Sequence, residues 1–282
     1  MSAYQKKGYL IQEFKIFRLK DASLKPIPAH YHEFHKIIVF LNGKSDYVIE
    51  GKRYTLEPND MIFIRAGEVH QPLPSPDIPY ERIIIYIDTS FLDNYKRGTD
   101  DLAACFTLAS KQAASVMHLT PGKSHDLMFH IEKLEFAAKQ KGFANALYID
   151  MLFLEFMILV NRALLGHELA AAAPVYDTKI LPIIDYINDH LCEDLSVDTL
   201  AEQFFLSKYH MMRRFKKATG YSIHRYITNK RLLKARALLK EEIPLTKLCY
   251  DCGFHDYSSF SRAFKEKFRQ TPQKYRKNLQ LE

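Results

Sequence analysis

Polar and basic side chains gather on one side of two short segments near the C-terminal end of the sequence. In residues 208–219, Met211 and Phe215 lie one helical turn apart, so both face a core and leave the opposite side to solvent. That outward side carries Tyr209, Met212, Arg213 and Lys216. In residues 257–269, the inward row is Phe260, Phe264 and Phe268, and the outward side carries Tyr257, Ser258, Ser261, Arg262 and Lys265. An arginine can donate two hydrogen bonds to a guanine edge, so each outward face has the side chains to read DNA bases.

Basic residues around these two faces have the charge to neutralise phosphates. From Ser207 to the end of the chain, 19 Lys and Arg stand against 6 Asp and Glu, whereas the whole chain has 40 against 33. The expected phosphate contacts are Lys216, Lys217, Arg231, Arg236, Lys265 and Lys267. The alternative is that both faces are the solvated sides of ordinary amphipathic helices. The concentrated positive charge and the duplication of the unit favour DNA binding.

Seven short helices are expected to position these residues. Their ranges are 178–192, 197–204, 208–219, 222–240, 245–252 and 257–269, with a last helix after Pro272. Ser196 and Ser207 are expected N-caps, and Gly220 ends the helix that begins after Ser207. The helices form two helix–tight turn–helix units joined by one long helix. Such a unit places its second helix in the major groove of DNA.

The first part of the chain predicts a β-structure. Between residues 28 and 88, runs rich in Ile, Val, Tyr and Phe are separated by turn signals such as Asn42-Gly43, which indicates an antiparallel sandwich or barrel. Residues 124–141 and 144–165 predict two helices. The second is apolar nearly all round, so it is either a core helix or part of a dimer interface. Residues 170–177 predict a linker, because Pro174 stops a helix and the charge balance changes just beyond it.

The composition is that of an ordinary globular protein. Hydrophobic residues make up 47% and charged residues 26%, which excludes disordered, collagen-like and coiled-coil rod proteins. The N-terminal residues lack the apolar core of a signal peptide, and Asp150 and Glu155 interrupt the most apolar stretch, so no membrane segment is expected. Four cysteines are too few for a disulfide framework. Cys249 and Cys252 form a single CxxC pair, which is expected to pack in a core rather than bind zinc or sense redox state.

The last hundred or so residues resemble the AraC/XylS family of bacterial transcription regulators. The resemblance rests on LSVDTLAEQFFLSKYHMMRRFKKATG, on RLLKARALL and on GFHDYSSFSRAFKEKF followed by TPQKYR. It implies base-reading positions at Tyr209, Met212, Arg213, Tyr257, Ser258, Ser261 and Arg262, and it adds Ser207 to the expected backbone contacts. Three positions depart from the family pattern. Ile223 replaces a proline, Arg269 replaces a glycine, and Arg214 replaces an apolar residue and is expected to reach a phosphate or solvent.

The N-terminal part resembles a cupin barrel, the sensor domain of many members of this family. His30-Tyr31-His32 with Gly43 is similar to the first cupin motif, and residues 57–70 are similar to the second. Metal-binding cupins hold an ion with two histidines, a glutamate and a third histidine. Lys36 stands at the glutamate position, and a cationic side chain is no ligand. No metal and no cofactor is therefore expected unless Glu33 or His35 substitutes. The remaining alternatives are a purely structural role or a small-molecule pocket, whose lining would be His30, His32, His35, Lys36 and His70.

These observations predict an α+β protein with two domains. The expected domains are a cupin-like β-barrel followed by helices at 1–169, a linker at 170–177, and an all-α domain with two helix-turn-helix units at 178–282. The resemblance implies a sequence-specific transcriptional regulator that is not an enzyme. Its implied partners are promoter DNA, RNA polymerase, a second copy of the chain and a small-molecule effector, which in this family is most often a sugar.

Activation is the commoner outcome in the family, and the expected location is the bacterial cytoplasm, with nucleoid association when the protein is bound. Two rival functions stay open. One is a cupin enzyme with a DNA-binding tail, and the other is a nucleoid-type protein that binds DNA without sequence choice.

Overall fold

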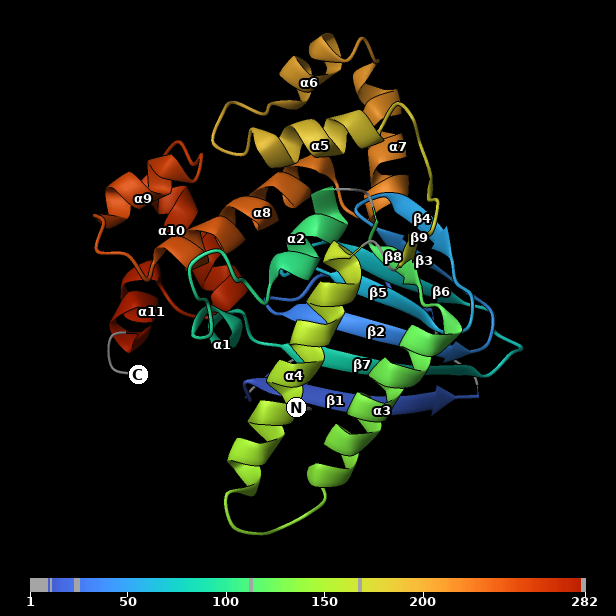
Figure 1. The fold of residues 1–282 in the computed structure, drawn as a ribbon. Helices are drawn as coiled ribbons and strands as arrows, with labels where there is room; N and C mark the ends of the chain where they lie inside the picture. Colours follow the sequence, from blue (N-terminus) through green and yellow to red (C-terminus); the bar gives the residue numbers. More distant parts are fainter. Residues whose placement is uncertain (1–9, 11, 23–25, 112–113, 167–168, 280–282) are drawn as a thin grey trace, which may run out of the picture. The chain divides into compact units, whose positions relative to one another are not determined.

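The computed structural model describes residues 10, 12–22, 26–111, 114–166 and 169–279, and it divides the chain into two compact units (Figure 1). The N-terminal unit comprises Met1–Ile49 and Arg53–Val175. The C-terminal unit comprises Tyr176–Glu282 together with Glu50–Lys52. Among the described residues, no helix is both long and apolar enough to cross a membrane.

The N-terminal unit is built on two antiparallel sheets, so the predicted β-structure is confirmed. The larger sheet has the strand order β1-β7-β2-β5-β8-β9, and the smaller has the order β10-β4-β3-β6. The strands are β1 (Phe14–Asp21), β2 (His35–Asn42), β3 (Ser45–Ile49), β4 (Lys52–Thr55), β5 (Asp60–Ile64), β6 (His70–Pro74), β7 (Tyr80–Ile87), β8 (Val116–His118), β9 (Ala170–Ala171) and β10 (Val175–Tyr176). The segment expected to be a linker thus contributes two short strands.

Strand β2 is buried on both faces, and the two faces belong to different cores. Ile37 and Val39 pack into a core shared with the helices, whereas Ile38 and Phe40 pack into a core shared with the smaller sheet. Successive side chains of a strand point to opposite faces, so one apolar strand supplies both cores. The strand ends in the bulge before Gly43, where φ is +124° and a Cβ would lie 2.6 Å from the Pro79 carbonyl oxygen.

Four helices accompany the larger sheet in sequence. They are α1 (Thr89–Asp93), α2 (Ala104–Lys111), α3 (Pro121–Ala137) and α4 (Asn145–Leu165). Figure 1 shows α3 and α4 as a hairpin across one face of this sheet. Helix α3 begins three residues before the predicted start, because Thr120 precedes a proline that favours the first helical turn, and it ends at Ala137, before the predicted Gly142.

The C-terminal unit contains the seven predicted helices, within its described residues 176–279. They are α5 (Leu181–Asp189), α6 (Val197–Gln203), α7 (Lys208–Thr219), α8 (Ile223–Leu238), α9 (Leu245–Asp251), α10 (Tyr257–Phe268) and α11 (Pro272–Leu279). The side chains of Ser196, Ser207 and Asp256 accept hydrogen bonds from backbone N–H groups of the first turns that follow them. Local capping therefore fixes where α6, α7 and α10 begin.

Two of the three departures from the family pattern, Arg269 and Ile223, lie at helix ends. Arg269 follows α10 with φ at +62°, in the left-handed region where glycine avoids a steric cost. Ile223 is the first residue of α8, where proline is favoured, and Ser222 still caps this helix through the N–H of Arg225. Both substitutions are accommodated without interrupting a helix.

Candidate DNA-binding surface and histidine cluster

The first helix-turn-helix unit consists of α6 and α7, and its predicted outward row is exposed. Met211 and Phe215 are fully buried, as the helical spacing requires. Tyr209 is 67% exposed and Met212 is 42% exposed, and Arg213 is also exposed. The Arg213 guanidinium lies 5.9 Å from the centre of the Tyr209 ring, so these two side chains occupy neighbouring positions on the surface.

The second helix-turn-helix unit consists of α9 and α10, and the side chains of its predicted outward row differ in exposure. Ser258 and Arg262 are exposed, whereas Ser261 is half-buried. Tyr257 is also half-buried, and it packs against the core around Phe260, with ring centres 5.8 Å apart. Tyr257 therefore supports the core of its unit in addition to its expected contact with a base.

The expected phosphate contacts fall into two groups. Lys216, Lys217 and Lys265 are exposed. Lys267 is half-buried, with its Nζ 3.4 Å from Asn229 Oδ1, and Arg236 lies 6.0 Å from the ring of Phe268. Ser207 is exposed, and its Oγ accepts a hydrogen bond from the N–H of His210.

Arg231 has a structural role that the sequence did not predict. Its Nε donates to the carbonyl oxygen of Leu191 at 2.8 Å, and its Nη2 donates to the carbonyl oxygen of Glu193 at 2.7 Å. These carbonyls follow the end of α5, where backbone acceptors lack helical partners. Burial lowers the pKa of Arg231. Two of its five N–H donors thus join α8 to the segment after α5, so Arg231 has a structural role in addition to its predicted phosphate contact.

Arg214 reaches solvent, as predicted, with 37% of its side chain exposed, and it also forms an ion pair. Its Nε and Nη2 donate to the two carboxylate oxygens of Asp177, at 2.7 and 2.6 Å. Burial raises the pKa of Asp177, but the hydrogen bonds from Arg214 and from the Lys179 backbone outweigh it, so the net shift is downward. This bidentate pair fixes α7 to the residues that precede α5.

The CxxC pair belongs to the core of the second helix-turn-helix unit, as predicted. Cys249 and Cys252 are fully buried among apolar side chains. Burial raises the pKa of Cys252 to about 12 and also raises that of Cys249. Both thiols therefore stay protonated at neutral pH.

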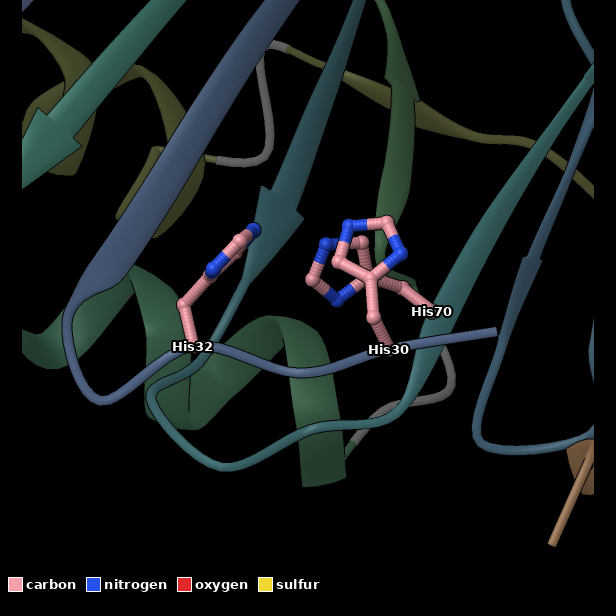
Figure 2. Close-up of side chains that lie close together, drawn as sticks. All are labelled: His30, His32 and His70. Atoms are coloured by element: carbon pink, nitrogen blue, oxygen red, sulfur yellow. The ribbon is translucent and has the colours of Figure 1, made fainter. Parts of the chain in front are cut away.

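Three of the predicted histidines form a cluster in the N-terminal unit. One ring nitrogen from each of His30, His32 and His70 lies within 4.8 Å of the others, and Figure 2 shows His32 opposite the rings of His30 and His70. The backbones of His30 and His70 exchange two hydrogen bonds, of 3.0 and 2.8 Å, in an isolated antiparallel bridge. His32 follows His30 by two residues, so an extended chain turns both rings to the same side.

The two other predicted pocket residues lie on opposite faces of β2. Lys36 points toward the cluster, with its Nζ 3.5 Å from His70 Nε2 and 3.4 Å from the Tyr47 hydroxyl. His35 stacks instead on Phe106, with ring centres 4.2 Å apart, and its Nδ1 accepts a hydrogen bond from the N–H of Ala66. His35 must therefore be removed from the predicted pocket. In the described part of the chain, neither His35 nor Glu33 belongs to the histidine cluster.

Burial and the lysine keep these imidazoles uncharged. Burial, followed by the charges of Lys36 and His30, lowers the pKa of His32 to about 2. Burial and the charge of Lys36 also lower the pKa of His70, and they lower the pKa of His30 although its hydrogen bond to the Pro28 carbonyl opposes them. Burial also lowers the pKa of Lys36 to about 7. At neutral pH the cluster thus consists of neutral rings with lone pairs available.

Sequence analysis missed the tyrosine of this site. Tyr47 is fully buried in β3, whose residues alternate between buried and half-buried positions. The residue types of β3, SDYVI, do not alternate between polar and apolar, so no local pattern indicated that Tyr47 faces the interior.

Comparison with known protein families agrees with both halves of this architecture. A family model described as an AraC-like ligand binding domain matches residues 21–157, and one described as a helix-turn-helix domain matches residues 200–278. Together they cover about three quarters of the chain, and they define a ligand-binding domain followed by a DNA-binding domain. The chain belongs to the AraC family of transcriptional regulators.

The similar proteins cover between about a third and nearly all of the chain. The HTH-type transcriptional activator RhaS of Shigella sonnei (strain Ss046) is 27% identical over 258 residues, which is 88% of this chain and 87% of that protein. Among solved structures, the C-terminal domain of AraT, a response regulator from Geobacillus stearothermophilus, is 28% identical and covers 36% of this chain and 86% of its own, with a TM-score of 0.35. ToxT from Vibrio cholerae is 13% identical and covers 94% of this chain and 98% of its own, with a TM-score of 0.36.

Proposed function

We propose that this protein activates transcription from a specific promoter when a small molecule binds its N-terminal unit. The observation that carries the proposal is the duplicated helix-turn-helix unit, in which Arg213 of α7 and Arg262 of α10 are both exposed. Each arginine is expected to read a guanine, while Lys216, Lys217 and Lys265 hold phosphates. Activation is inferred from the relatives named as activators, and it requires a contact with RNA polymerase.

Competition between a promoter fragment and bulk DNA across a range of salt concentrations tests sequence choice. A regulator prefers its own site by a factor of about a thousand or more, whereas a nucleoid-type protein shows a ratio near one. We expect Arg213→Ala to weaken binding to the promoter site by about 1–3 kcal/mol and to remove the preference for one base at a single position of that site. Lys217→Ala, as the matched control on the same helix, should weaken binding to all sequences alike. A changed base preference in Lys217→Ala would contradict these assignments.

A row of exposed apolar side chains on α4 supports the proposed homodimer. Leu147, Met151 and Leu165 are each about 60% exposed, and Ile158 is 39% exposed. Residues 151, 158 and 165 are separated by seven, and Leu147 adds the four-residue step of a heptad. Such a row suits a two-fold symmetric contact with α4 of a second copy.

A single charged substitution tests this dimer. We expect Met151→Glu to convert the protein to a monomer in analytical ultracentrifugation, because it places a carboxylate in the apolar row. Lys139→Glu, an exposed charge change after α3, should leave the dimer intact. A dimer that survives Met151→Glu must use another surface.

The proposed effector site is the polar interior around Lys36, His30, His32 and His70. A sugar suits hydrogen-bonding groups of this kind, and no catalytic role is proposed for them. Thermal-shift measurements on the full chain with a panel of metabolites identify the effector. Lys36→Met should abolish the shift that the effector produces, and an equal shift in both proteins would place the effector elsewhere. Because it acts on promoter DNA, the protein is expected to work in the cytoplasm, on the nucleoid when bound.

A further inference from the structure

The orientation of two histidine rings in the cluster is set by the backbone. His30 Nδ1 lies 2.8 Å from the carbonyl oxygen of Pro28, and His70 Nδ1 lies 3.0 Å from the carbonyl oxygen of Glu68. A carbonyl oxygen can only accept a hydrogen bond, so each Nδ1 carries the proton and each Nε2 keeps its lone pair. A backbone carbonyl bound to the remote ring nitrogen is the arrangement by which proteins orient histidines toward a metal ion.

The third histidine has a buried nitrogen with no partner. His32 Nε2 is inaccessible to solvent and makes no hydrogen bond with the described residues. Its ring stacks on Phe34, with ring centres 4.7 Å apart, and its centre lies 5.0 and 5.1 Å from those of His30 and His70. A buried polar atom without a partner is rare and costly, so a missing partner at this point is the simplest explanation.

We propose that His30, His32 and His70 bind one divalent ion of the zinc class, which includes Zn²⁺, Co²⁺ and Ni²⁺. Ring nitrogens that already lie within 4.8 Å of one another need only small rotations to reach the metal–nitrogen distance of about 2.0–2.1 Å. Three imidazoles without a carboxylate favour these ions over Mg²⁺, Ca²⁺ or Mn²⁺, which prefer oxygen ligands. Three protein ligands also leave a coordination position for water.

Lys36 determines how tightly this site holds its ion. Its Nζ lies 3.5 Å from His70 Nε2, where a positive charge repels a cation. The lysine therefore does not remove the site, as the comparison with metal-binding cupins suggested, but weakens it. Replacement of Lys36 should consequently strengthen metal binding, and a carboxylate at this position should strengthen it most.

The experiment titrates ZnCl₂ into the metal-free full-length protein by calorimetry and CoCl₂ by visible absorption. We expect one ion per chain. His32→Phe keeps the stacking on Phe34 and removes the ring nitrogens, so it should weaken binding at least tenfold. His125→Phe is the matched control, because His125 is exposed on α3 outside the cluster, and it should bind as the unchanged protein does.

Two further measurements keep the result independent of folding defects. Since His32 Nε2 has no partner, metal-free His32→Phe should melt no lower than the unchanged protein, while Zn²⁺ should raise the melting temperature of the unchanged protein alone. Lys36→Glu should bind Co²⁺ more tightly than Lys36→Met, and both more tightly than the unchanged protein. No binding in any of these proteins, or binding that His32→Phe leaves intact, would overturn the proposal. DNA binding by the C-terminal unit is measured separately and does not depend on this result.

Discussion

Replacement of Arg231 by methionine distinguishes a structural arginine from a DNA contact. Methionine retains much of the apolar stem, so the substitution removes mainly the guanidinium. Two hydrogen bonds are lost, to the carbonyl oxygens of Leu191 and Glu193. The expected result is a less stable C-terminal unit that still binds DNA when folded.

The magnitude follows from the surroundings of the two carbonyl groups. A hydrogen bond from a charged donor contributes about 1.5–3 kcal/mol, but an exposed acceptor regains most of it from water. Glu193 is exposed and Leu191 is half-buried, so mainly the Leu191 bond counts. We therefore expect the free energy of unfolding to fall by about 2 kcal/mol. For a unit of about this size, that lowers the melting temperature by on the order of 10 °C.

Urea unfolding of the full-length protein, followed by circular dichroism, measures this loss. Arg225→Met is the matched control, because Arg225 lies on the same helix α8 and is exposed. DNA affinity is then measured by fluorescence anisotropy at several salt concentrations. Unchanged stability of Arg231→Met, together with a salt dependence reduced by about one phosphate contact, would refute the structural role.

Three further substitutions test contacts within single units. Gly253→Ala should destabilise the C-terminal unit by at least about 1 kcal/mol in urea unfolding, because φ is +83° and the new Cβ would lie 2.5 Å from the Leu191 carbonyl oxygen. Asn161→Ala should cost about 2–4 kcal/mol in the same assay, because the buried amide bonds three backbone groups at 2.8 to 2.9 Å, and a loss below 1 kcal/mol would contradict this. Arg214→Met should cost up to about 1 kcal/mol at pH 7, since its pair with Asp177 is partly exposed. The folded-state pKa of Asp177 is lowered, so the ion pair stabilises the fold fully above about pH 3.9, and this stabilisation is lost as the pH falls through the folded-state pKa. The difference in the free energy of unfolding between Arg214→Met and the unchanged protein should therefore disappear at low pH. A difference that persists at pH 2 would exclude the ion pair as its cause.

The helices of the C-terminal unit were predictable because their signals are local. Ser196 and Ser207 cap helices through N–H groups three residues away, and Gly220 ends α7 with φ at +76°. Each signal and its effect lie within a few residues, so no tertiary information is needed. Strand β1 was missed because it is half-exposed and pairs only with β7, which follows it by more than fifty residues.

The contacts of Arg231 and Arg214 were not predictable from local pattern. Arg231 bonds carbonyls about forty residues earlier in the chain, and Arg214 bonds a carboxylate 37 residues earlier. A basic residue on a helix of a DNA-binding domain has the same local sequence whether it meets a phosphate or a backbone carbonyl. Only the fold decides between these roles, so charge alone does not identify which basic residues also stabilise the fold.

The histidine cluster shows which part of a site a sequence can specify. His35 and Lys36 are adjacent in β2, and adjacent residues of a strand point to opposite faces. Their spacing in the sequence therefore shows that only one of the two side chains can face the cluster. A prediction that grouped both residues in one pocket ignored this rule, whereas the spacing of two between His30 and His32 obeyed it. What spacing could not supply is the backbone bridge between His30 and His70, since it joins segments forty residues apart. That bridge brings the third ring to the other two, and it turns a short sequence motif into a group of three converging nitrogen atoms.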